Sequence, residues 1–416
     1  MTNDTSPFRR PTPGESEASA AAPGDLARFA PPQAPGEDYW RHVRSAFDLK
    51  PGWTFFNHGT QGPTPLNVTA VYHAAIDELS HDPASNPRDR IQSVRNRLAR
   101  FVAVDPAEIA LTRSTTEGMN IFAHGLDWKP GDEVIIGTHE HFGGVQPYQT
   151  LRDRFGIRII EIDSPVWPAT NDQIVAAYEA ALTSATRLIV VSHVNYVTGL
   201  RAPIRELADL AHRNGVLISV DGAQSLGVLP LDLGNSNVDH YAGSGQKWFL
   251  AGTGTGFSYI KREVQDRVWP TSGYHDLNAA QDNPWAGQRY ERVGQKNVPS
   301  LLAIGAAVDL HNTIGPETIA GRVADLATRL RSGLKSIPGV RLWTGDDPAF
   351  TAGLTTFSAN CIASADLVQT LRSDFQIVIR PIQHAEVDAV RVSTHFFNSP
   401  EEVDRLVSVV DSLTAR

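Results

Sequence analysis

The stretch of sequence that decides the fold is "HYAGSGQKWFLAGTGTG", residues 240–256. It places one lysine, Lys247, between a Gly-Gln pair and a Trp-Phe pair. Lysine is normally a solvated surface residue, and a lysine among small residues most often belongs to an exposed loop. Three more specific interpretations compete with this one, and residues elsewhere in the chain decide among them.

Two of the three interpretations fail on their motifs. Residues 244–247 match the S-x-x-K motif of β-lactam-binding serine enzymes, but the S-D-N and K-T-G elements that this chemistry also requires do not occur. The "GTGTG" run resembles a dinucleotide-binding fingerprint, but Tyr259 stands where the third glycine of G-x-G-x-x-G should be. The remaining interpretation is a lysine with a reactive amine, and such a lysine needs partner residues elsewhere in the chain.

Composition indicates a soluble globular protein. The 416 residues are too many for one ordinary core and suggest a large domain with a smaller one. The net charge of −9 is spread along the chain, so we expect binding to neither nucleic acid nor a membrane, and no apolar run is long enough to cross one. The single cysteine, Cys361, excludes an internal disulfide and a zinc site of cysteine pairs, and we expect no metal site.

The N-terminal residues predict neither an export signal nor an ordered segment. Arg9-Arg10 could begin a twin-arginine signal, but the "GESEASAAAPGD" that follows is polar where such a signal is apolar. We therefore expect a cytoplasmic protein. Residues 1–35 are rich in Pro, Ala, Ser, Gly and Glu, and this composition predicts a disordered tail.

From about residue 86 helical and strand patterns alternate, which predicts an α/β fold with a mostly parallel sheet and helices on both faces. We assign residues 36–300 to this large domain, with a short N-terminal helix within 36–50. Beyond it two long helical stretches lead into short strands and a last helix, so we assign residues 301–416 to a smaller C-terminal α+β domain. Ligands of parallel sheets bind beyond the carboxyl ends of the strands.

Residues that suit one particular cofactor follow the predicted strands. Asp221 ends "VLISVD", Thr115 and Thr116 open a helix after "EIALT", and His141 follows "DEVIIGT". An aspartate can keep a proton on a pyridine nitrogen, threonines at a helix N-terminus can hold a phosphate, and a histidine ring can stack on an aromatic ring. Together with Lys247 as a Schiff-base lysine, these groups meet the requirements of pyridoxal 5'-phosphate (PLP).

Two further residues complete the set. Gln224 could donate a hydrogen bond to the phenolic oxygen of the cofactor, and Arg391 offers a planar fork that fits a substrate carboxylate. Each residue alone has an ordinary explanation as a helix cap, a surface ion pair or a structural histidine. Because they occur together and in this order, they predict a PLP site for a small amino-acid-like substrate.

The blocks "SHVNYVTG", "VDGAQS", "SGQKW" and "RVSTHFFN" make the sequence resemble the class V aminotransferase family. This family of fold-type I PLP-dependent enzymes includes cysteine desulfurases, selenocysteine lyases and isopenicillin N epimerases. The resemblance extends from "FFNHGTQGPTP" to "RVSTHFFNSPEEVDRL", nearly all of the chain after the tail. It implies the fold-type I architecture and a homodimer with active sites at the subunit interface.

The resemblance also implies roles for individual residues. Lys247 would bind PLP covalently, Asp221 would hold the pyridine nitrogen, Gln224 would bind the phenolic oxygen, and His141 would stack on the ring. The hydroxyl residues that would hold the phosphate are Thr115, Thr116 and Ser244.

The sequence departs from the family pattern at three positions of the site. In the family a Gly-Thr pair of the neighbouring subunit completes the phosphate site, whereas the matching stretch here reads Gly294-Gln295. Gln246 stands where desulfurases usually carry histidine. Asn195-Tyr196 stands where they usually carry a Ser-Asn pair, so the Tyr196 hydroxyl is a candidate contact of the phenolic oxygen. We count Asn195, Tyr196, Gly294 and Gln295 among the predicted cofactor-binding residues.

The reaction is expected to begin with loss of the Cα proton of the substrate, with Lys247 as the base. A desulfurase needs a thiolate in the loop before the substrate arginine, but "RPIQHAEVDAVR" has no cysteine, and we expect Cys361 to be a small buried hydrophobe of the small domain. We therefore expect an epimerase- or aminotransferase-type reaction that resembles isopenicillin N epimerase. Two alternatives stay open: a C–S lyase that acts on a cysteine-derived substrate by β-elimination, and a PLP-binding protein without catalysis.

Three histidines lie in loops that could select the substrate: His58, His275 and His384. Each is a candidate for a second acid–base group, although a lone histidine more often has a structural role. We count His58, with Arg391, among the predicted substrate-binding residues.

Overall fold

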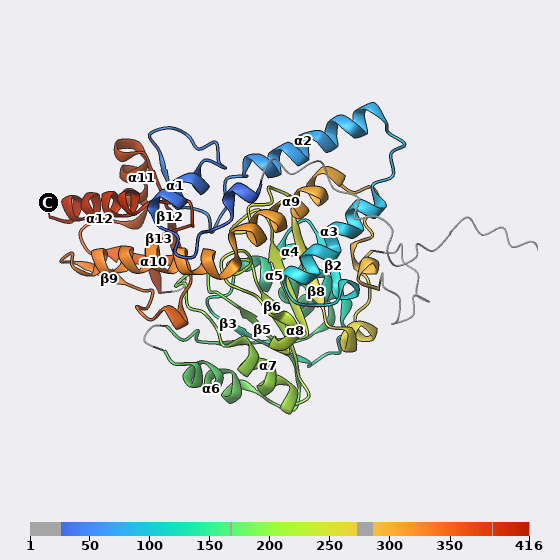
Figure 1. Ribbon diagram of the computed structural model, residues 1–416. Coiled ribbons are helices and arrows are strands. Elements are labelled where there is room, and N and C mark those ends of the chain that lie inside the picture. Colours follow the sequence, from blue (N-terminus) through green and yellow to red (C-terminus); the bar gives the residue numbers. More distant parts are fainter. Residues whose placement is uncertain (1–25, 167–168, 273–285, 385, 416) are drawn as a thin grey trace, which may run out of the picture.

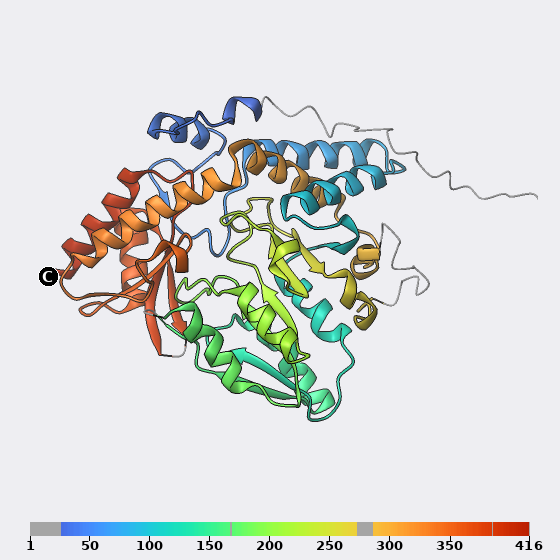
Figure 2. The ribbon, with the colours of Figure 1, turned by 60° about the horizontal axis from the view of Figure 1, so that its bottom comes forward.

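The computed structural model describes residues 26–166, 169–272, 286–384 and 386–415. These residues form a large α/β domain around a seven-stranded sheet and a smaller domain around a four-stranded sheet (Figure 1). Figure 2 shows the C-terminal helices and strands, coloured orange to red, gathered on one side of the large domain. The predicted division into a large domain and a smaller C-terminal one describes this arrangement.

The central sheet is mostly parallel, as the alternating pattern predicts. Its order is β2-β8-β7-β6-β5-β3-β4, and β8 runs antiparallel to both of its neighbours. The strands of this sheet are β2 (Ile109–Thr112), β3 (Glu133–Gly137), β4 (Arg158–Ile162), β5 (Thr186–Ser192), β6 (Leu217–Asp221), β7 (His240–Ser244) and β8 (Gly256–Ile260). The α-helices that accompany it are α2 (Leu66–His81), α3 (Arg88–Phe101), α4 (Thr115–Gly125), α5 (Phe142–Phe155), α6 (Asn171–Ala181), α7 (Ile204–Arg213), α8 (Leu233–Ser236) and α9 (Val298–Ile314). Short 3-10 turns are η2 (Pro106–Glu108), η3 (Arg262–Arg267) and η4 (Ala286–Glu291).

Helices cover both faces of this sheet because successive strand residues point to opposite sides. Ile135 and Ile189 belong to one apolar cluster, which includes residues of α3, α6, α7 and α9. Their neighbours Val134 and Val190 belong to a second cluster, which includes residues of α4 and α5. The two clusters explain why these strands read as continuous apolar runs.

The small domain is built on an antiparallel sheet with the order β12-β13-β10-β9. Its strands are β9 (Val340–Leu342), β10 (Leu354–Ala359), β12 (Arg380–His384) and β13 (Val387–Ser393). The helices that pack with it are α10 (Pro316–Lys335), α11 (Ser364–Phe375) and α12 (Pro400–Thr414), and η5 (Pro348–Phe350) precedes β10. None of the described helices combines the length and the apolarity that a membrane span requires.

The boundary between the two domains lies later than the predicted residue 300. Helix α9 packs on α2 and α3, and its Leu301 and Val308 share one apolar cluster with Val94 and Leu98 of α3. The chain turns at Gly315, whose φ of +92° favours glycine, before α10 begins. Residues 301–314 therefore belong to the large domain, because their apolar side chains are covered there.

The N-terminal segment differs from its prediction in two ways. Residues 1–25 of the predicted tail lie outside the described residues, but η1 (Leu26–Phe29) already packs Leu26 and Phe29 into an apolar cluster, so the tail cannot extend to residue 35. The predicted helix is α1 (Glu37–Arg44), but it contacts the C-terminal part of the chain rather than the large domain alone. Arg44 forms an ion pair with Glu402 of α12, and β1 (Thr54–Phe55) pairs in parallel with β11 (Ile377–Val378).

The carboxyl ends of the parallel strands gather the predicted site residues at one edge of the sheet. Asp221 is the last residue of β6, and Ser244 is the last residue of β7. His141 follows β3, Tyr196 follows β5, and Thr115 follows β2. This edge faces the hairpin of β12 and β13, which carries Arg391.

Candidate active site

A cavity of about 210 Å³ lies at this edge of the sheet, between the two domains. Residues of both domains line it, and most of the predicted site residues are among them. The predicted residues that line the cavity are Thr115, Thr116, His141, Tyr196, Asp221, Gln224, Ser244, Lys247 and Arg391. Residues separated by almost 280 positions in the chain therefore share one site.

Lys247 is a cavity-lining amine whose pKa is lowered toward neutral pH. Its side chain is partly exposed where it lines the cavity, yet desolvation lowers its pKa to about 8. The charge of Asp221 opposes this shift, and the guanidinium groups of Arg391 and Arg380 add to it. An amine with this pKa is available as a nucleophile or a base near neutral pH.

Asp221 supplies the buried acid of the site. Burial raises the pKa of its carboxyl group, while Lys247 and the backbone N–H of Ala223, which donates to Oδ1 over 2.9 Å, lower it. A Cβ added at Gly144 would lie 3.4 Å from Oδ2, so glycine leaves room beside this oxygen. The second carboxylate oxygen can therefore take a partner from the cavity.

The N-terminus of α4 forms the anion-binding end of the cavity. Ser114 caps the helix by accepting a hydrogen bond from the N–H of Glu117, and α4 begins at Thr115. The hydroxyl oxygens of Thr115 and Ser244 lie 2.7 Å apart, and Thr116 follows on the same turn. Backbone N–H groups, hydroxyls and the helix dipole together favour a phosphate at this end.

His141 is a neutral ring at the edge of the cavity. It is the N-cap of α5, and its Nδ1 accepts a hydrogen bond from the N–H of Gly143 over 3.1 Å. Burial lowers its pKa to about 4, and the positive charges of Lys247, Arg380 and Arg391 contribute. An uncharged imidazole of this kind suits stacking on an aromatic ring.

Arg391 is the most deeply buried cation of the site. Its side chain is almost inaccessible to solvent, and burial, with the charge of Arg380, lowers its pKa to about 9. Its contacts are with the carbonyl of Tyr196, at 3.0 Å, and the hydroxyl of Thr60, at 3.4 Å, while Nε has no hydrogen-bond partner among the described residues. A buried guanidinium whose described contacts are all neutral is prepared to bind an anion.

Arg380 also lines the cavity, although no motif in the sequence singles it out. Arg380 is paired with Arg391 across β12 and β13, and its Nη1 donates to Thr60 Oγ1 over 2.9 Å. Side chains of residues paired in this way lie on the same face of the sheet. A prediction of this hairpin register would have identified Arg380 as a site residue.

Gln224 lines the cavity with its amide already engaged at both ends. Nε2 donates to the carbonyl of Gly59, and Oε1 accepts from Nε1 of Trp248, each over 2.8 Å. One N–H of the amide remains for a ligand. A Cβ added at Gly59 would lie 2.9 Å from Arg391 Nη2 and 3.0 Å from Gln224 Oε1, so only glycine lets this loop approach so closely.

Four predicted site residues do not line the cavity, and His58 is the first of them. His58 is fully buried among the rings of Phe55, Trp248, His395 and Phe397, and its Nε2 lies 3.1 Å from Asn398 Oδ1. Desolvation lowers the pKa of His58 to about 3, so it is a neutral core histidine and the prediction of substrate binding is wrong.

Asn195 is used by its own loop. Its Oδ1 accepts hydrogen bonds from the N–H groups of Val197 and Thr198, and its Nδ2 donates to the carbonyl of His139. These bonds hold the turn that presents Tyr196, so Asn195 shapes the site without lining it. The predicted direct contact between Asn195 and the cofactor is therefore not supported.

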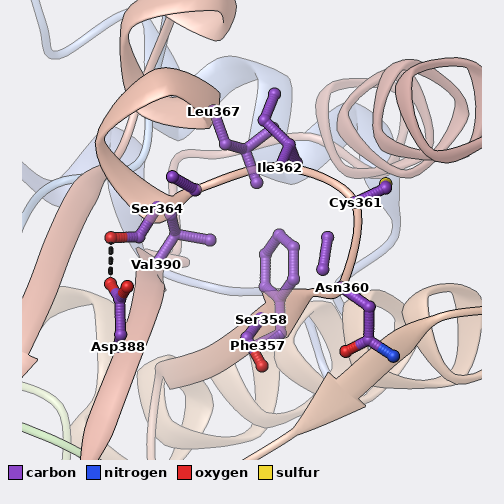
Figure 3. Close-up of a pocket in the computed structure, with 11 residues that line it drawn as sticks. Phe357, Ser358, Asn360, Cys361, Ile362, Ser364, Leu367, Asp388 and Val390 are labelled. Carbon is purple, nitrogen blue, oxygen red and sulfur yellow. Dashed lines mark hydrogen bonds between the residues drawn. The ribbon is translucent and has the colours of Figure 1, made fainter.

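Cys361 is exposed, and the prediction that it is buried is wrong. It lies at the expected junction of β10 and α11, on the rim of a separate cavity of about 320 Å³ (Figure 3). Figure 3 shows the hydroxyl of Ser364 donating to Asp388 on the other side of that cavity, away from the sulfur. Cys361 lies in the turn after β10, and its sulfur is 3.9 Å from the carbonyl oxygen of Thr414 in α12.

The other predicted residues have simple outcomes. Gly294 and Gln295 are exposed and do not line the cavity of their own chain. His275 lies outside the described residues. His384 does not line the cavity, but it contacts Tyr196, which does.

The donor set fits PLP. The cavity holds an amine for a carbonyl group, a buried carboxylate for a ring nitrogen, and a neutral imidazole beside the space where a ring would lie. The N-terminus of α4, with the hydroxyls of Thr115 and Ser244, could bind a phosphate, and Gly144 leaves room beside Asp221. These groups would hold the cofactor, and Arg391 would remain for its substrate.

Comparisons with known proteins support a PLP cofactor. The sequence profile described as aminotransferase class V matches residues 67–406. The chain is 29% identical over 391 residues to isopenicillin N epimerase from Streptomyces clavuligerus, and the alignment covers 90% of this chain and 98% of the relative. It is 27% identical over 398 residues to a probable cysteine desulfurase from Methanothermobacter thermautotrophicus, with coverages of 89% and 97%.

A solved structure of the protein C-DES gives a TM-score of 0.80 at 29% identity, and the match covers 88% of this chain and 98% of that chain. That structure is of a lysine-to-alanine mutant with glycine covalently linked to the PLP cofactor. A second structure describes C-DES as a cystine C–S lyase in complex with cysteine persulfide.

Proposed function

The chain belongs to the class V aminotransferase family and is a PLP-dependent enzyme, and we propose that it removes the Cα proton of an amino-acid substrate and returns a proton to that carbon, as an epimerase does. The observation that carries this proposal is that one cavity holds both an amine with a pKa of about 8 and the buried, anion-seeking Arg391. The likeness to isopenicillin N epimerase supports the same reaction class.

Asp221 and the N-terminus of α4 would hold the cofactor from its two ends. When bound, PLP withdraws electrons from the Cα atom of an attached amino acid and makes the Cα proton acidic. The buried carboxylate of Asp221 would keep a proton on the ring nitrogen, and Thr115 and Ser244 would hold the phosphate. This arrangement would hold the cofactor by its ring nitrogen and by its phosphate, and would so orient Cα of the substrate.

Lys247 would act as the base for the Cα proton. Because desolvation lowers its pKa from 10.5 to about 8, roughly a tenth of this amine is unprotonated at pH 7, whereas at the ordinary lysine pKa less than about one part in a thousand would be. The ammonium that forms would be stabilised by the carboxylate of Asp221, which already raises the pKa of Lys247.

Arg391 would orient the substrate through its carboxylate. A guanidinium presents two parallel N–H donors that match a carboxylate, and a buried pair of this kind gives both affinity and direction. Arg391 and the carbonyl of Tyr196 are already 3.0 Å apart, so the fork is held in place before the substrate arrives.

A second candidate is β-elimination of a Cβ–S bond, a C–S lyase reaction. The similarity to C-DES at 29% identity favours this reaction, because C-DES is described as a cystine C–S lyase. The chemistry would share the first step, removal of the Cα proton, and would differ in what leaves Cβ. A persulfide on the enzyme is not part of either candidate, since Cys361 is outside the cavity.

We further propose that the enzyme is a homodimer whose subunits complete one another's sites. Gly294 and Gln295 are exposed and lie away from their own cavity, as residues that serve a neighbouring subunit would. Light scattering after size exclusion tests the dimer, and a monomer that retains full PLP affinity would contradict it.

The proposed reaction is tested by incubating the holoenzyme in deuterated water with a panel of L- and D-amino acids. Four products are followed separately: deuterium at Cα, the opposite enantiomer, keto acid, and pyruvate with sulfide. Inversion accompanied by deuterium supports the epimerase, and pyruvate with sulfide from cysteine or cystine supports the lyase. A panel without any exchange at Cα would contradict both candidates.

A further inference from the structure

Tyr196 and His384 form a hydrogen-bonded pair beside the cavity. The hydroxyl oxygen of Tyr196, in the loop after β5, lies 2.9 Å from Nδ1 of His384 at the end of β12. The other ring nitrogen of His384, Nε2, lies 2.7 Å from the carbonyl oxygen of Thr138. The pair joins a cavity-lining residue of the large domain to the hairpin of the small domain.

The carbonyl of Thr138 determines which way this hydrogen bond runs. A carbonyl oxygen only accepts, so Nε2 of His384 must carry the hydrogen. In a neutral imidazole Nδ1 then has a lone pair and no hydrogen, and the Tyr196 hydroxyl must be the donor. His384 is thus oriented as an acceptor for the phenolic proton, in the way that a third group orients the histidine of a catalytic triad.

Burial keeps the Tyr196 phenol protonated until a proton acceptor acts. Burial raises the pKa of the Tyr196 phenol and the charge of Glu140 contributes, while Arg380 and Arg391 oppose the shift. Behind His384, Nε2 of His139 lies 3.2 Å from Oε1 of Glu386. The phenol alone is therefore a poor base near neutral pH, and a neighbouring imidazole is what allows it to accept a proton from elsewhere.

The other polar groups that line the cavity are less suited to this task. Nδ1 of His141 already accepts a hydrogen bond, and its pKa of about 4 leaves the ring a weak base. Asp221 is assigned to the ring nitrogen of the cofactor, and Arg380 and Arg391 are assigned to anion binding. Among the described lining residues, Lys247 and Tyr196 are thus the groups that can exchange a proton with the substrate.

We propose that Tyr196 is a second catalytic acid–base residue that exchanges a proton with Cα on the side opposite to Lys247, and that His384 is the positioning residue that receives and returns the phenolic proton. This inference rests on the proposed function. As the Cα proton moves to the oxygen of Tyr196, the hydroxyl proton of Tyr196 moves to Nδ1 of His384, and the electron pair of the C–H bond stays with the substrate. The reverse transfer returns a proton, so removal by one group and delivery by the other inverts Cα without any oxidant or reductant.

The hydrogen bond itself is tested without measuring turnover. Holoenzyme labelled with ¹⁵N-histidine should show one imidazole whose Nε2 is protonated and whose Nδ1 accepts a hydrogen bond, and His384→Gln should remove that signal. Tyr196→Phe should shift the Nδ1 resonance of the same ring. A His384 ring that is protonated on Nδ1, or one whose resonance ignores Tyr196→Phe, overturns the inference.

The catalytic role is tested with an amino acid that the wild type inverts in deuterated water. Tyr196→Phe should lower inversion about 100-fold or more, while Cα exchange of one enantiomer, carried out by Lys247, stays within about threefold of the wild type. His384→Gln should lower kcat for inversion with little change in KM. Tyr39→Phe is the matched control, because its hydroxyl donates to the carbonyl of Phe29 outside the site, and it should invert at the wild-type rate.

The two proposals fail in distinguishable ways. A wild type that exchanges no Cα proton of any amino acid contradicts the proposed function, and the inference falls with it. A wild type that exchanges the proton but never inverts Cα, or a Tyr196→Phe variant that inverts at the wild-type rate, overturns this inference alone.

Discussion

Arg380 and Arg391 face each other across the hairpin of β12 and β13, and both guanidinium groups reach the hydroxyl oxygen of Thr60. Two like charges side by side repel, and the charge of Arg380 contributes to the lowered pKa of Arg391. Both charges also contribute to the lowered pKa of Lys247. The two arginines of the hairpin therefore lower the pKa of Lys247 in the large domain before a substrate anion binds.

Replacing Arg391 should weaken substrate binding. Arg391→Ala removes the charged hydrogen bonds to the carboxylate, which should weaken substrate binding by roughly 2–3 kcal/mol. KM for amino-acid substrates should therefore rise about 30- to 150-fold. The visible spectrum of the bound cofactor should not change. Steady-state kinetics measures the effect, and an unchanged KM would mean that the carboxylate is held elsewhere.

Replacing Arg380 should move the pH dependence of the reaction upward. Its charge lowers the pKa of Lys247, so Arg380→Gln should raise that pKa, and the unprotonated amine should then form only at higher pH. Cα exchange should rise with pH through about 8 in the wild type and at a higher pH in the variant, so that the variant is slower at neutral pH. A pH–rate profile that does not move contradicts this electrostatic coupling.

Lys247 should be the covalent attachment point of the cofactor. Reduction of the holoenzyme with borohydride, followed by peptide mass spectrometry, should find the pyridoxyl group on Lys247, and Lys247→Ala should prevent this attachment. Lys335→Ala is the control, because Lys335 is an exposed partner of Asp346, and it should leave the adduct in place. An adduct on any other lysine would falsify the assignment.

Asp221 should matter more for turnover than for cofactor retention. Asp221→Ala removes the charge that keeps the ring nitrogen protonated, and we expect a loss of about two orders of magnitude or more in kcat, while the phosphate contacts keep PLP bound. Asp221→Asn, which preserves the shape and loses the charge, should behave in the same way. Turnover near the wild-type rate in both variants would show that Asp221 has another role.

Cys361→Ser should leave activity essentially unchanged. The residue is exposed, and its sulfur lies 3.9 Å from the carbonyl oxygen of Thr414. It does not line the cavity that contains Lys247. Neither epimerisation nor β-elimination requires a thiol of the enzyme. If both this substitution and alkylation of the wild type abolished turnover, persulfide chemistry would have to be considered again.

Much of the site could be predicted because its residues follow strands whose apolar runs are unmistakable. Asp221, Thr115 and His141 follow such runs, and parallel strands bring these ends to one edge. The same local reasoning was wrong for His58, because nothing in its neighbourhood in the sequence shows that rings from residues 248 and 395–397 surround it. The prediction for Cys361 was wrong for the converse reason, since the apolar character of the residue does not reveal that its side chain is exposed to solvent.

The α/β architecture and the choice of Lys247 and Asp221 as site residues could be predicted from the sequence, because periodicity and residue type act over a few neighbouring positions. The place of α9 in the large domain, the position of Arg380 beside Arg391 and the hydrogen bond from Tyr196 to His384 follow from the three-dimensional packing alone. Tyr196 and His384 are 188 positions apart. A local pattern shows which face of an element is apolar or polar, but the packing of whole elements selects the residue that meets that face.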